Sequence, residues 1–91
     1  MFYVYILFSH KDKKLYTGFS TNLKSRIDKH QKGFVKATKN RRPIELIYYE
    51  AFADEIDARR REIYLKGGNG KASMKIQLKE ILNKLDYKHI I

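Results

Sequence analysis

The sequence predicts an α+β fold in which a small three-stranded antiparallel sheet is flanked by helices. Three observations lead to this class: strand-like runs at residues 2–8, 15–19 and 44–50, helical patterns between and after them, and turn or capping residues at the junctions. The expected order is strand, strand, helix, strand, helix, helix. Because 91 residues are few for a self-sufficient core, we expect a single domain over residues 1–91.

The first two strands should form a hairpin. The run Phe2–Phe8 is rich in aromatic and β-branched residues, and the polar stretch His10–Lys14 contains Asp12, which favours a turn. The chain then returns as Leu15–Phe19. Side chains alternate along a strand, so the two faces of the first strand carry different sets. One face carries Tyr3, Tyr5 and Leu7, and the other carries Phe2, Val4 and Ile6.

A basic helix should follow, from about residue 22 to residue 32. It has three candidate N-cap residues, namely Ser20, Thr21 and Asn22, and Gly33 is typical of the residue just after a helix. Leu23 and Ile27 form its inward stripe, with His30 at the edge of that stripe. Arg26 and His30 are four residues apart and therefore lie on the same side of the helix.

The second half should add one strand and two helices. Pro43 ends the basic connection 33–42, and the strand 44–50 follows. Asp54 is a good N-cap for a helix that reaches about Lys66 and places Ala58, Glu62 and Leu65 on one side. The glycine-rich stretch 67–70 should break the chain. The last helix, Met74–Leu85, carries one continuous apolar stripe.

Charge is the strongest compositional signal. Twenty basic residues against ten acidic ones give a net charge of +10, which favours a polyanionic partner such as DNA, with RNA not excluded. A basic protein with no such partner is the plain alternative. No apolar stretch approaches the roughly 20 residues of a membrane span, so we expect no membrane partner. The absence of cysteine excludes disulfides and thiolate metal sites and fits a cytoplasmic protein.

Five residues have side chains that suit phosphodiester hydrolysis, which needs an activated water and stabilisation of the developing charge. They are Tyr5, Tyr16, Arg26, His30 and Glu62. A carboxylate such as Glu62 can hold a Mg²⁺ ion together with waters and a substrate phosphate. Each residue also has an ordinary interpretation: packing for the tyrosines and histidine, a solvated helix face for Arg26, and helical ion pairs with Arg59 or Lys66 for Glu62.

The order of these residues resembles the GIY-YIG nuclease family, and most closely its small single-domain bacterial members. Tyr3-Val4-Tyr5 takes the place of the first name-giving tripeptide, and Tyr16-Thr17-Gly18 that of the second. Further matching segments are Asn22–His30, with the spacing NLxxRxxxH, Arg41-Arg42-Pro43, and the run Ala58–Glu62. The resemblance covers about residues 2–70.

The resemblance implies a one-metal hydrolysis of nucleic acid, with a single Mg²⁺ or Mn²⁺ ion held by Glu62. Tyr5 and Tyr16 match the motif tyrosines; Tyr5 is favoured as general base and Tyr16 for positioning the water or phosphate, with the reverse assignment open. Arg26 matches the arginine that stabilises the phosphoryl charge. His30 matches a histidine that only part of the family carries near the base.

Several positions bear on this match. Gly18 matches the motif glycine, for which we expect close approach of a helix or the substrate. Tyr3 and Thr17 depart from the tripeptides without altering the catalytic set. Met74 stands near the place where some members carry a polar residue beyond the glutamate, and Asn69 is a loose substitute.

The leading hypothesis is a metal-dependent DNA endonuclease of weak sequence preference that acts on branched, nicked or damaged DNA, as in DNA repair, or depends on a separate specificity partner. The alternative is a non-catalytic basic module that only binds nucleic acid. In either case the expected nucleic-acid contacts are Lys24, Lys36, Lys39, Arg41, Arg42 and Arg59. A third hypothesis gives the last helix a partner, and we expect a monomer or weak homodimer.

Overall fold

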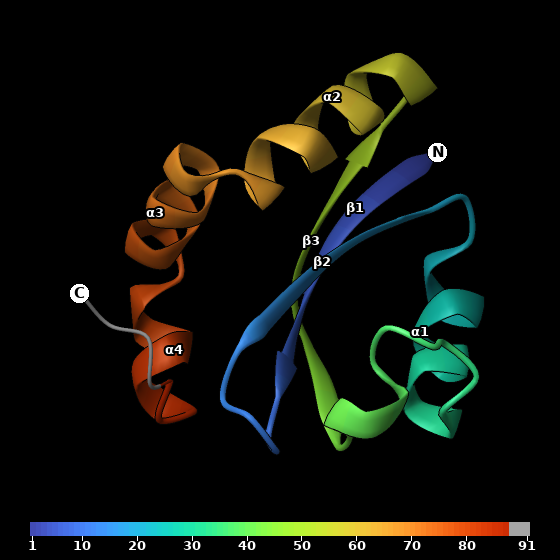
Figure 1. The fold of residues 1–91 in the computed structure, drawn as a ribbon. Helices are drawn as coiled ribbons and strands as arrows, with labels where there is room; N and C mark the ends of the chain where they lie inside the picture. The colour runs from blue at the N-terminus through green and yellow to red at the C-terminus, as the bar shows by residue number, and fades with distance from the viewer. Residues whose placement is uncertain (88–91) are drawn as a thin grey trace.

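The computed structural model describes residues 1–87 and contains one three-stranded sheet (Figure 1). Strands β1 (Phe2–Ser9), β2 (Leu15–Ser20) and β3 (Ile44–Phe52) lie in the order β2-β1-β3. Both neighbours of β1 pair with it antiparallel. The predicted α+β class, the antiparallel sheet and the order of elements are therefore confirmed.

One face of β1 forms the main apolar core. Val4 and Ile6 pack against Ala58 and Leu65 of α2 (Glu55–Lys66) and against Met74 of α3 (Gly68–Gln77). All five side chains are at most 2% exposed. Each such side chain contributes roughly 1.5–3 kcal/mol when it is fully buried, with the small Ala58 contributing less.

The other face of β1 is covered by α1 (Leu23–Lys32), which lies across the sheet from α3 and α4 (Figure 1). Tyr5 and Leu7 belong to this second cluster, and Leu23 and Ile27 of α1 pack against them. The two faces thus follow the alternation that the sequence predicts for β1. A bulge between Ile6 and Leu7 shifts the pairing with β3 by one residue.

Short polar residues fix where α1 and α2 begin. The side chain of Asn22 accepts a hydrogen bond from the backbone N–H of Ser25 at 3.1 Å, and that of Asp54 accepts from Ile56 at 2.8 Å. Gly33 ends α1 with φ of 82°, a left-handed conformation that favours glycine. Asn22 is therefore the cap among the three candidates.

The glycine-rich stretch breaks the helical run as predicted, but the break is only one residue long. Helix α3 begins at Gly68, directly after a single non-helical residue, Gly67. Gly70 is buried, and a Cβ atom on it would collide with the backbone carbonyl of Tyr64. The glycines therefore allow α2 and α3 to meet in close backbone contact.

The predicted single helix over residues 74–85 is wrong. Helix α3 ends at Gln77, the backbone turns at Leu78, and a separate short helix, α4 (Lys79–Lys84), follows. The reason lies in the packing, because Met74 belongs to the main core, whereas Leu82 of α4 packs with Phe8 and Tyr87 at the far end of β1. None of the helices within residues 1–87 has the length and apolarity to cross a bilayer.

Candidate active site

Both motif tyrosines lie on the α1 face of the sheet. Tyr5 pairs across the strands with Gly18, and Tyr16 pairs with Leu7, so the two tyrosines are diagonal neighbours on one face. Tyr5 is fully buried, while Tyr16 is half-buried at the edge strand β2. Tyr16 is therefore the phenol that solvent reaches.

The imidazole of His30 joins the tyrosines to the loop after α1. The Tyr5 hydroxyl lies 2.8 Å from His30 Nε2, and His30 Nδ1 lies 2.7 Å from Thr38 Oγ1. All three side chains are at most 1% exposed. The ring centroid of Tyr16 is also 5.4 Å from that of His30. Thr38, His30 and Tyr5 thus form a buried hydrogen-bonded chain that leads towards the site.

A neutral histidine donates from only one ring nitrogen, so this chain has two arrangements. In the first, Tyr5 donates to Nε2 and Nδ1–H donates to Thr38. In the second, Thr38 donates to Nδ1 and Nε2–H donates to Tyr5. In both arrangements each ring nitrogen of His30 is satisfied, which a buried imidazole requires.

The motif glycine makes room for Tyr5. A Cβ atom on Gly18 would collide with the Tyr5 ring carbon Cζ and hydroxyl oxygen. The expected close neighbour of Gly18 within the fold, a helix, is therefore wrong, and the approach of the substrate to Gly18 stays a prediction. The close neighbour is the phenol on the adjacent strand.

Arg26 extends from α1 towards the Tyr5 hydroxyl, and its guanidinium opposes, without reversing, the rise that burial causes in the pKa of that phenol. Its Nε atom is buried and has no hydrogen-bond partner among residues 1–87. Most buried N–H groups in folded proteins have a partner, so this donor is an exception at a position where an acceptor from outside the chain would satisfy it.

Burial is the largest influence on the pKa values of Tyr5 and His30. The pKa of Tyr5 is raised by desolvation, which outweighs Arg26, and the charges of Tyr16 and Glu62 raise it further. Burial, followed by the charge of Arg26, lowers the pKa of His30 to about 4. Tyr5 therefore keeps its proton, and His30 is neutral, at neutral pH.

Glu62 faces the same site from α2. Its side chain is only 14% exposed, and Oε2 lies 2.9 Å from Lys66 Nζ while Oε1 lies 3.8 Å from Arg59 Nη1. The helical ion pairs that the sequence suggests are thus present. Arg59, which contacts this carboxylate, also lines a groove together with Arg26, so Glu62 lies next to a residue of that groove.

The chemistry of this donor set suits a hard divalent cation. Glu62 belongs to no cluster of three or more histidine, cysteine, aspartate or glutamate side chains able to hold a metal within residues 1–87. Mg²⁺ is commonly bound by one or two carboxylates, with waters and substrate phosphates completing its shell. Glu62 fits that pattern.

A basic groove connects α1 to α2 across the end of β2. Its lining includes Arg26 and Lys29 from α1, Ser20 at the end of β2, and Arg59 from α2. The Arg59 guanidinium stacks on the Phe19 ring at 3.6 Å, which holds it over the strand. The groove therefore combines cations from both helices beside the candidate catalytic residues.

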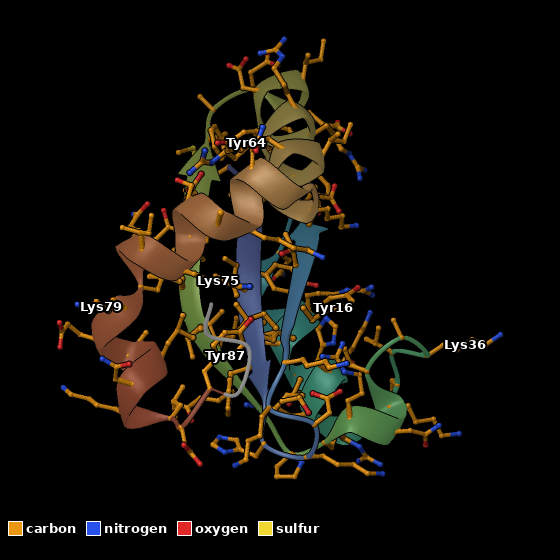
Figure 2. The ribbon with its side chains drawn as sticks, turned by 60° about the vertical axis from the view of Figure 1, so that its left-hand side comes forward. Tyr16, Lys36, Tyr64, Lys75, Lys79 and Tyr87 are labelled. Atoms are coloured by element: carbon orange, nitrogen blue, oxygen red, sulfur yellow. The ribbon has the colours of Figure 1, made fainter. Side chains whose placement is uncertain are left out.

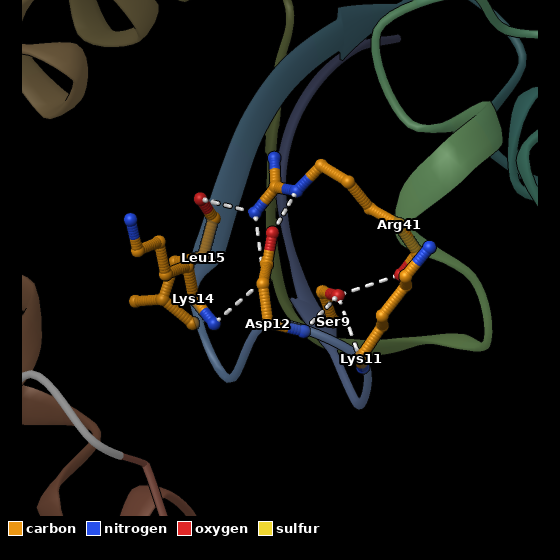
Figure 3. Close-up of polar contacts among 6 residues, drawn as sticks. All are labelled: Ser9, Lys11, Asp12, Lys14, Leu15 and Arg41. Carbon is orange, nitrogen blue, oxygen red and sulfur yellow. Dashed lines mark hydrogen bonds and ion pairs between the residues drawn. The ribbon is translucent and has the colours of Figure 1, made fainter.

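The six expected nucleic-acid contacts are not equivalent in the structure. Five are exposed: Lys24, Lys36, Lys39, Arg42 and Arg59. Arg41 instead lies in a short 3-10 helix before β3 (Lys39–Arg41) and reaches the hairpin turn, where its Nε donates to Asp12 at 2.6 Å and its backbone carbonyl accepts from Ser9 at 2.6 Å (Figure 3). This pairing gives Arg41 a structural role in joining the hairpin to the loop before β3.

The polar contact that some family members have beyond the glutamate is not supplied by Met74, which is a core residue only 2% exposed. Asn69 lies exposed in the first turn of α3. The sequence also gives no signal for Thr38, which lies in a connection without periodicity, eight residues after His30.

Together, the two tyrosines on neighbouring strands, the helix with Arg26 and His30, and Glu62 on the following helix follow the pattern of a nuclease-type domain. The family model described as the GIY-YIG catalytic domain matches residues 1–77. The chain belongs to the GIY-YIG family.

Similar proteins come from several bacteria. The chain is 46% identical over 67 residues to UPF0213 protein CPE1444 of Clostridium perfringens, covering 72% of this chain and 71% of that protein. It is 43% identical over 75 residues to UPF0213 protein SH2523 of Staphylococcus haemolyticus, covering 81% and 90%. The solution structure of UPF0213 protein BH0048 from Bacillus halodurans aligns with a TM-score of 0.53 and 38% identity, over 87% of this chain and 86% of that one.

Proposed function

We propose that this protein is an endonuclease that hydrolyses phosphodiester bonds in DNA and requires a single Mg²⁺ or Mn²⁺ ion. One observation carries the proposal: residues from β1, β2, α1 and α2 converge around the Tyr5 hydroxyl. Tyr16, Arg26 and Glu62 all act on its pKa, and His30 contacts it at 2.8 Å. Ordinary packing does not require a lone carboxylate, a guanidinium and two phenols at one point.

Tyr16 is the better general base in this arrangement. It is half-buried at the edge strand, whereas Tyr5 is fully buried, keeps its proton and contacts His30. A general base must reach the water that it deprotonates. We therefore assign the water to Tyr16, and to Tyr5 and His30 the positioning of the site, which is the reverse of the assignment that the sequence favours.

Arg26 is assigned to the phosphate. Its unpartnered Nε and its planar guanidinium offer donors that match a phosphate oxygen, and the hydrogen bonds would strengthen as negative charge develops. The basic groove that contains Arg26, Lys29 and Arg59 would hold the neighbouring backbone phosphates.

Glu62 is the residue that would hold the divalent ion. When bound, the ion would supply Lewis-acid charge to the phosphate and favour ionisation of a water. Lys66 and Arg59 contact Glu62 in the absence of an ion, and these ion pairs orient its carboxylate.

The test is a nicking assay on supercoiled DNA with Mg²⁺, comparing the wild type with Glu62→Gln. We expect nicking to fall by about 10²–10³-fold or more, the scale of losing one transition-state contact. Glu55→Gln is the matched control because Glu55 lies on the same helix, is exposed and also pairs with Arg59. Its nicking rate should stay within about twofold, which is an effect of less than 0.5 kcal/mol.

Two results would contradict the proposal. Equal nicking by the wild type and Glu62→Gln would show that Glu62 has no catalytic role. Salt-sensitive DNA binding by both proteins without nicking by either would favour the alternative function, a basic nucleic-acid-binding module. That alternative is supported by the five exposed basic residues among the expected nucleic-acid contacts.

A further inference from the structure

Phe34 exposes its ring, in contrast to the other phenylalanines of the chain. It is 74% exposed, and its ring makes no aromatic or cation–π contact within residues 1–87. Single exposed apolar side chains are common on protein surfaces. What distinguishes Phe34 is its surroundings. The other four phenylalanines are buried or half-buried, and they are Phe2, Phe8, Phe19 and Phe52.

A loop that is tied at both ends carries this ring. We call residues 33–38 the Phe34 loop. At its start, the Phe34 N–H donates to the carbonyl of Lys29 at 2.9 Å. At its end, Thr38 Oγ1 lies 2.7 Å from His30 Nδ1. The ring is therefore presented on a fixed backbone, and pre-organisation of this kind lowers the entropy that binding costs.

The same contacts place the Phe34 loop beside the candidate active site. His30, which holds the end of the loop, has its ring centroid 5.4 Å from that of Tyr16. Lys29, which holds the start of the loop, lines the basic groove. In Figure 2 the loop, marked by Lys36, lies on the same side of the sheet as Tyr16. A strand that leaves the basic groove past Tyr16 therefore has the Phe34 loop within reach.

The surroundings of the loop are cationic. The stretch 29–42 contains six basic residues and no acidic one. Lys32 pairs with Asp28, and Arg41 pairs with Asp12. The remaining four basic residues form no ion pair within residues 1–87, and they are Lys29, Lys36, Lys39 and Arg42. Uncompensated cations around an exposed ring favour a polyanion that carries flat rings of its own, which describes nucleic acid.

Arg42 adds a donor for a phosphate next to the ring. Its Nε donates to the carbonyl of Lys39 at 3.0 Å. Its guanidinium lies so close to Gly33 that a Cβ atom there would approach the Arg42 Cζ atom to 2.6 Å. The two terminal nitrogens make no hydrogen bond within residues 1–87, so they can donate to a phosphate. Because Gly33 directly precedes Phe34, a phosphate donor and a stacking surface lie one residue apart.

An aromatic ring of this kind distinguishes between forms of nucleic acid. In a continuous duplex each base covers the faces of its neighbours, so the protein reaches only base edges. In a single strand, a flap or an unpaired strand end, the faces are free to stack on aromatic side chains. Phe34 can therefore stack only on a base that lies outside a continuous duplex.

We propose that Phe34 stacks on an unpaired base of the bound strand while Arg42 holds a phosphate of the same strand, so that the protein prefers nucleic acid with unpaired bases to continuous duplex. This inference rests on the proposed function for the nucleic acid in the basic groove. It adds Phe34 to the residues that contact the substrate and names the form of substrate that they select.

The first test measures binding without turnover. A fluorescently labelled single-stranded oligonucleotide and a fully paired duplex of the same length are titrated with the Glu62→Gln protein, with and without Phe34→Ala. We expect about tenfold weaker binding of the single strand and a change below about twofold for the duplex. Phe34→Tyr keeps an aromatic ring and should restore the binding of the single strand.

The matched control is Ile76→Ala in the same background. Ile76 is 78% exposed and lies on α3, across the sheet from α1 (Figure 1). Its truncation should change the binding of the single strand by less than about twofold, as is usual for surface positions. Equal losses from Phe34→Ala and Ile76→Ala, or no loss from Phe34→Ala, would overturn the proposal. Equal losses for single strand and duplex would overturn the preference for unpaired bases.

The second test detects the stacking directly. The chain has no tryptophan, so Phe34→Trp introduces a single indole at the position of the ring. Its fluorescence should fall when the single strand binds, because a stacked base quenches an indole. At saturation, an abasic strand of the same length should leave it unchanged. Ile76→Trp should not respond to either strand. The same response of Phe34→Trp to the normal and the abasic strand would overturn the stacking.

These readouts do not depend on cleavage. Binding that depends on Phe34, in a protein that never nicks DNA, would support this inference and contradict the proposed endonuclease. Nicking that requires Glu62, without any effect of Phe34→Ala on binding, would contradict this inference and support the endonuclease.

Discussion

Val4 and Tyr5 are adjacent on β1 and enter opposite environments. Val4 joins an apolar core with Leu65 and Met74, whereas Tyr5 joins a polar cluster with His30 and Thr38. Both sets are almost completely buried. The apolar side is stabilised by its buried apolar surface area and its dense packing. The polar side is stabilised only while every hydrogen-bond donor and acceptor has a partner.

This difference shows how a small domain separates stability from chemistry. One strand supplies both faces, so the α2–α3 side can carry most of the unfolding free energy. The α1 side can then hold buried polar groups that would otherwise destabilise the fold. Substitutions on the two sides should therefore destabilise the protein in different ways. On the α2–α3 side they remove buried side-chain volume, and on the α1 side they remove hydrogen-bond partners.

The largest effect on stability is expected from Leu65→Ala. Leu65 is 1% exposed in the main core, and truncation of a buried leucine costs about 2–5 kcal/mol in unfolding free energy. Urea denaturation measures the loss. The control is Ile63→Ala on the same helix, where the side chain is 73% exposed and we expect a change below about 0.5 kcal/mol. Similar losses in both variants would contradict the division of α2 into a core face and a solvent face.

Gly18→Ala should be next, because the new methyl group collides with the Tyr5 phenol. Overpacking of this kind costs about 1–3 kcal/mol. The displaced Tyr5 should also lose its contact with His30, so nicking should fall together with stability. Gly68→Ala is the control, since nothing lies within 4 Å of its added Cβ. An unchanged Gly18→Ala protein would show that the phenol has free space.

Thr38→Val keeps the shape of the side chain and removes the partner of His30 Nδ1. We expect a loss of about 1–2 kcal/mol from the unpaired buried nitrogen and a lower nicking rate at an unchanged DNA affinity. Thr38→Ser retains the hydroxyl and should restore most of the nicking rate. If valine and serine behave alike, the chain from Thr38 to Tyr5 does not position the site.

The smallest effect is a pH dependence of stability. The folded pKa of His30, at about 4, lies below its ordinary value of 6.5, so the unfolded chain binds the proton first. The resulting stabilisation is present above pH 6.5 and is lost as the pH falls towards 4. Between pH 6.5 and pH 5.5 the unfolding free energy should drop by about 1 kcal/mol.

Urea titrations at the two pH values would measure this drop. Asp12 and Glu50 have lowered pKa values caused by hydrogen bonds from Arg41 and Arg61, so their losses begin at more acidic pH. The wild type and His10→Gln, which removes a partly exposed histidine, should show the same drop. A flat profile for His10→Gln would assign the effect to His10 instead of His30.

The local features of the fold could be predicted from the sequence because they depend on neighbours in the chain. Alternation along β1, the cap at Asn22, the stop at Gly33 and the cap at Asp54 each follow from a few adjacent residues. The association of Arg26 with His30 follows from helical spacing in the same way.

The remaining features depend on contacts between distant segments. The interruption at Leu78 arises because Met74 and Leu82 pack into different clusters, although both fit one helical stripe. Thr38 reaches His30 through the folding of an irregular loop, and Arg41 reaches Asp12 across 29 residues. The close contact of Gly18 with Tyr5 requires the strand register, which no single segment specifies.

The central position of β1 has a consequence for how this chain tolerates insertions and deletions. A shift of one residue in the pairing would exchange its two faces, and would place Tyr5 in the main apolar core while Val4 faced α1. Gain or loss of a codon before Ser9 should therefore abolish folding and catalysis together. The hairpin turn lies outside the paired strands, but its length is constrained in a different way, because Asp12 and Ser9 bond to Arg41 there.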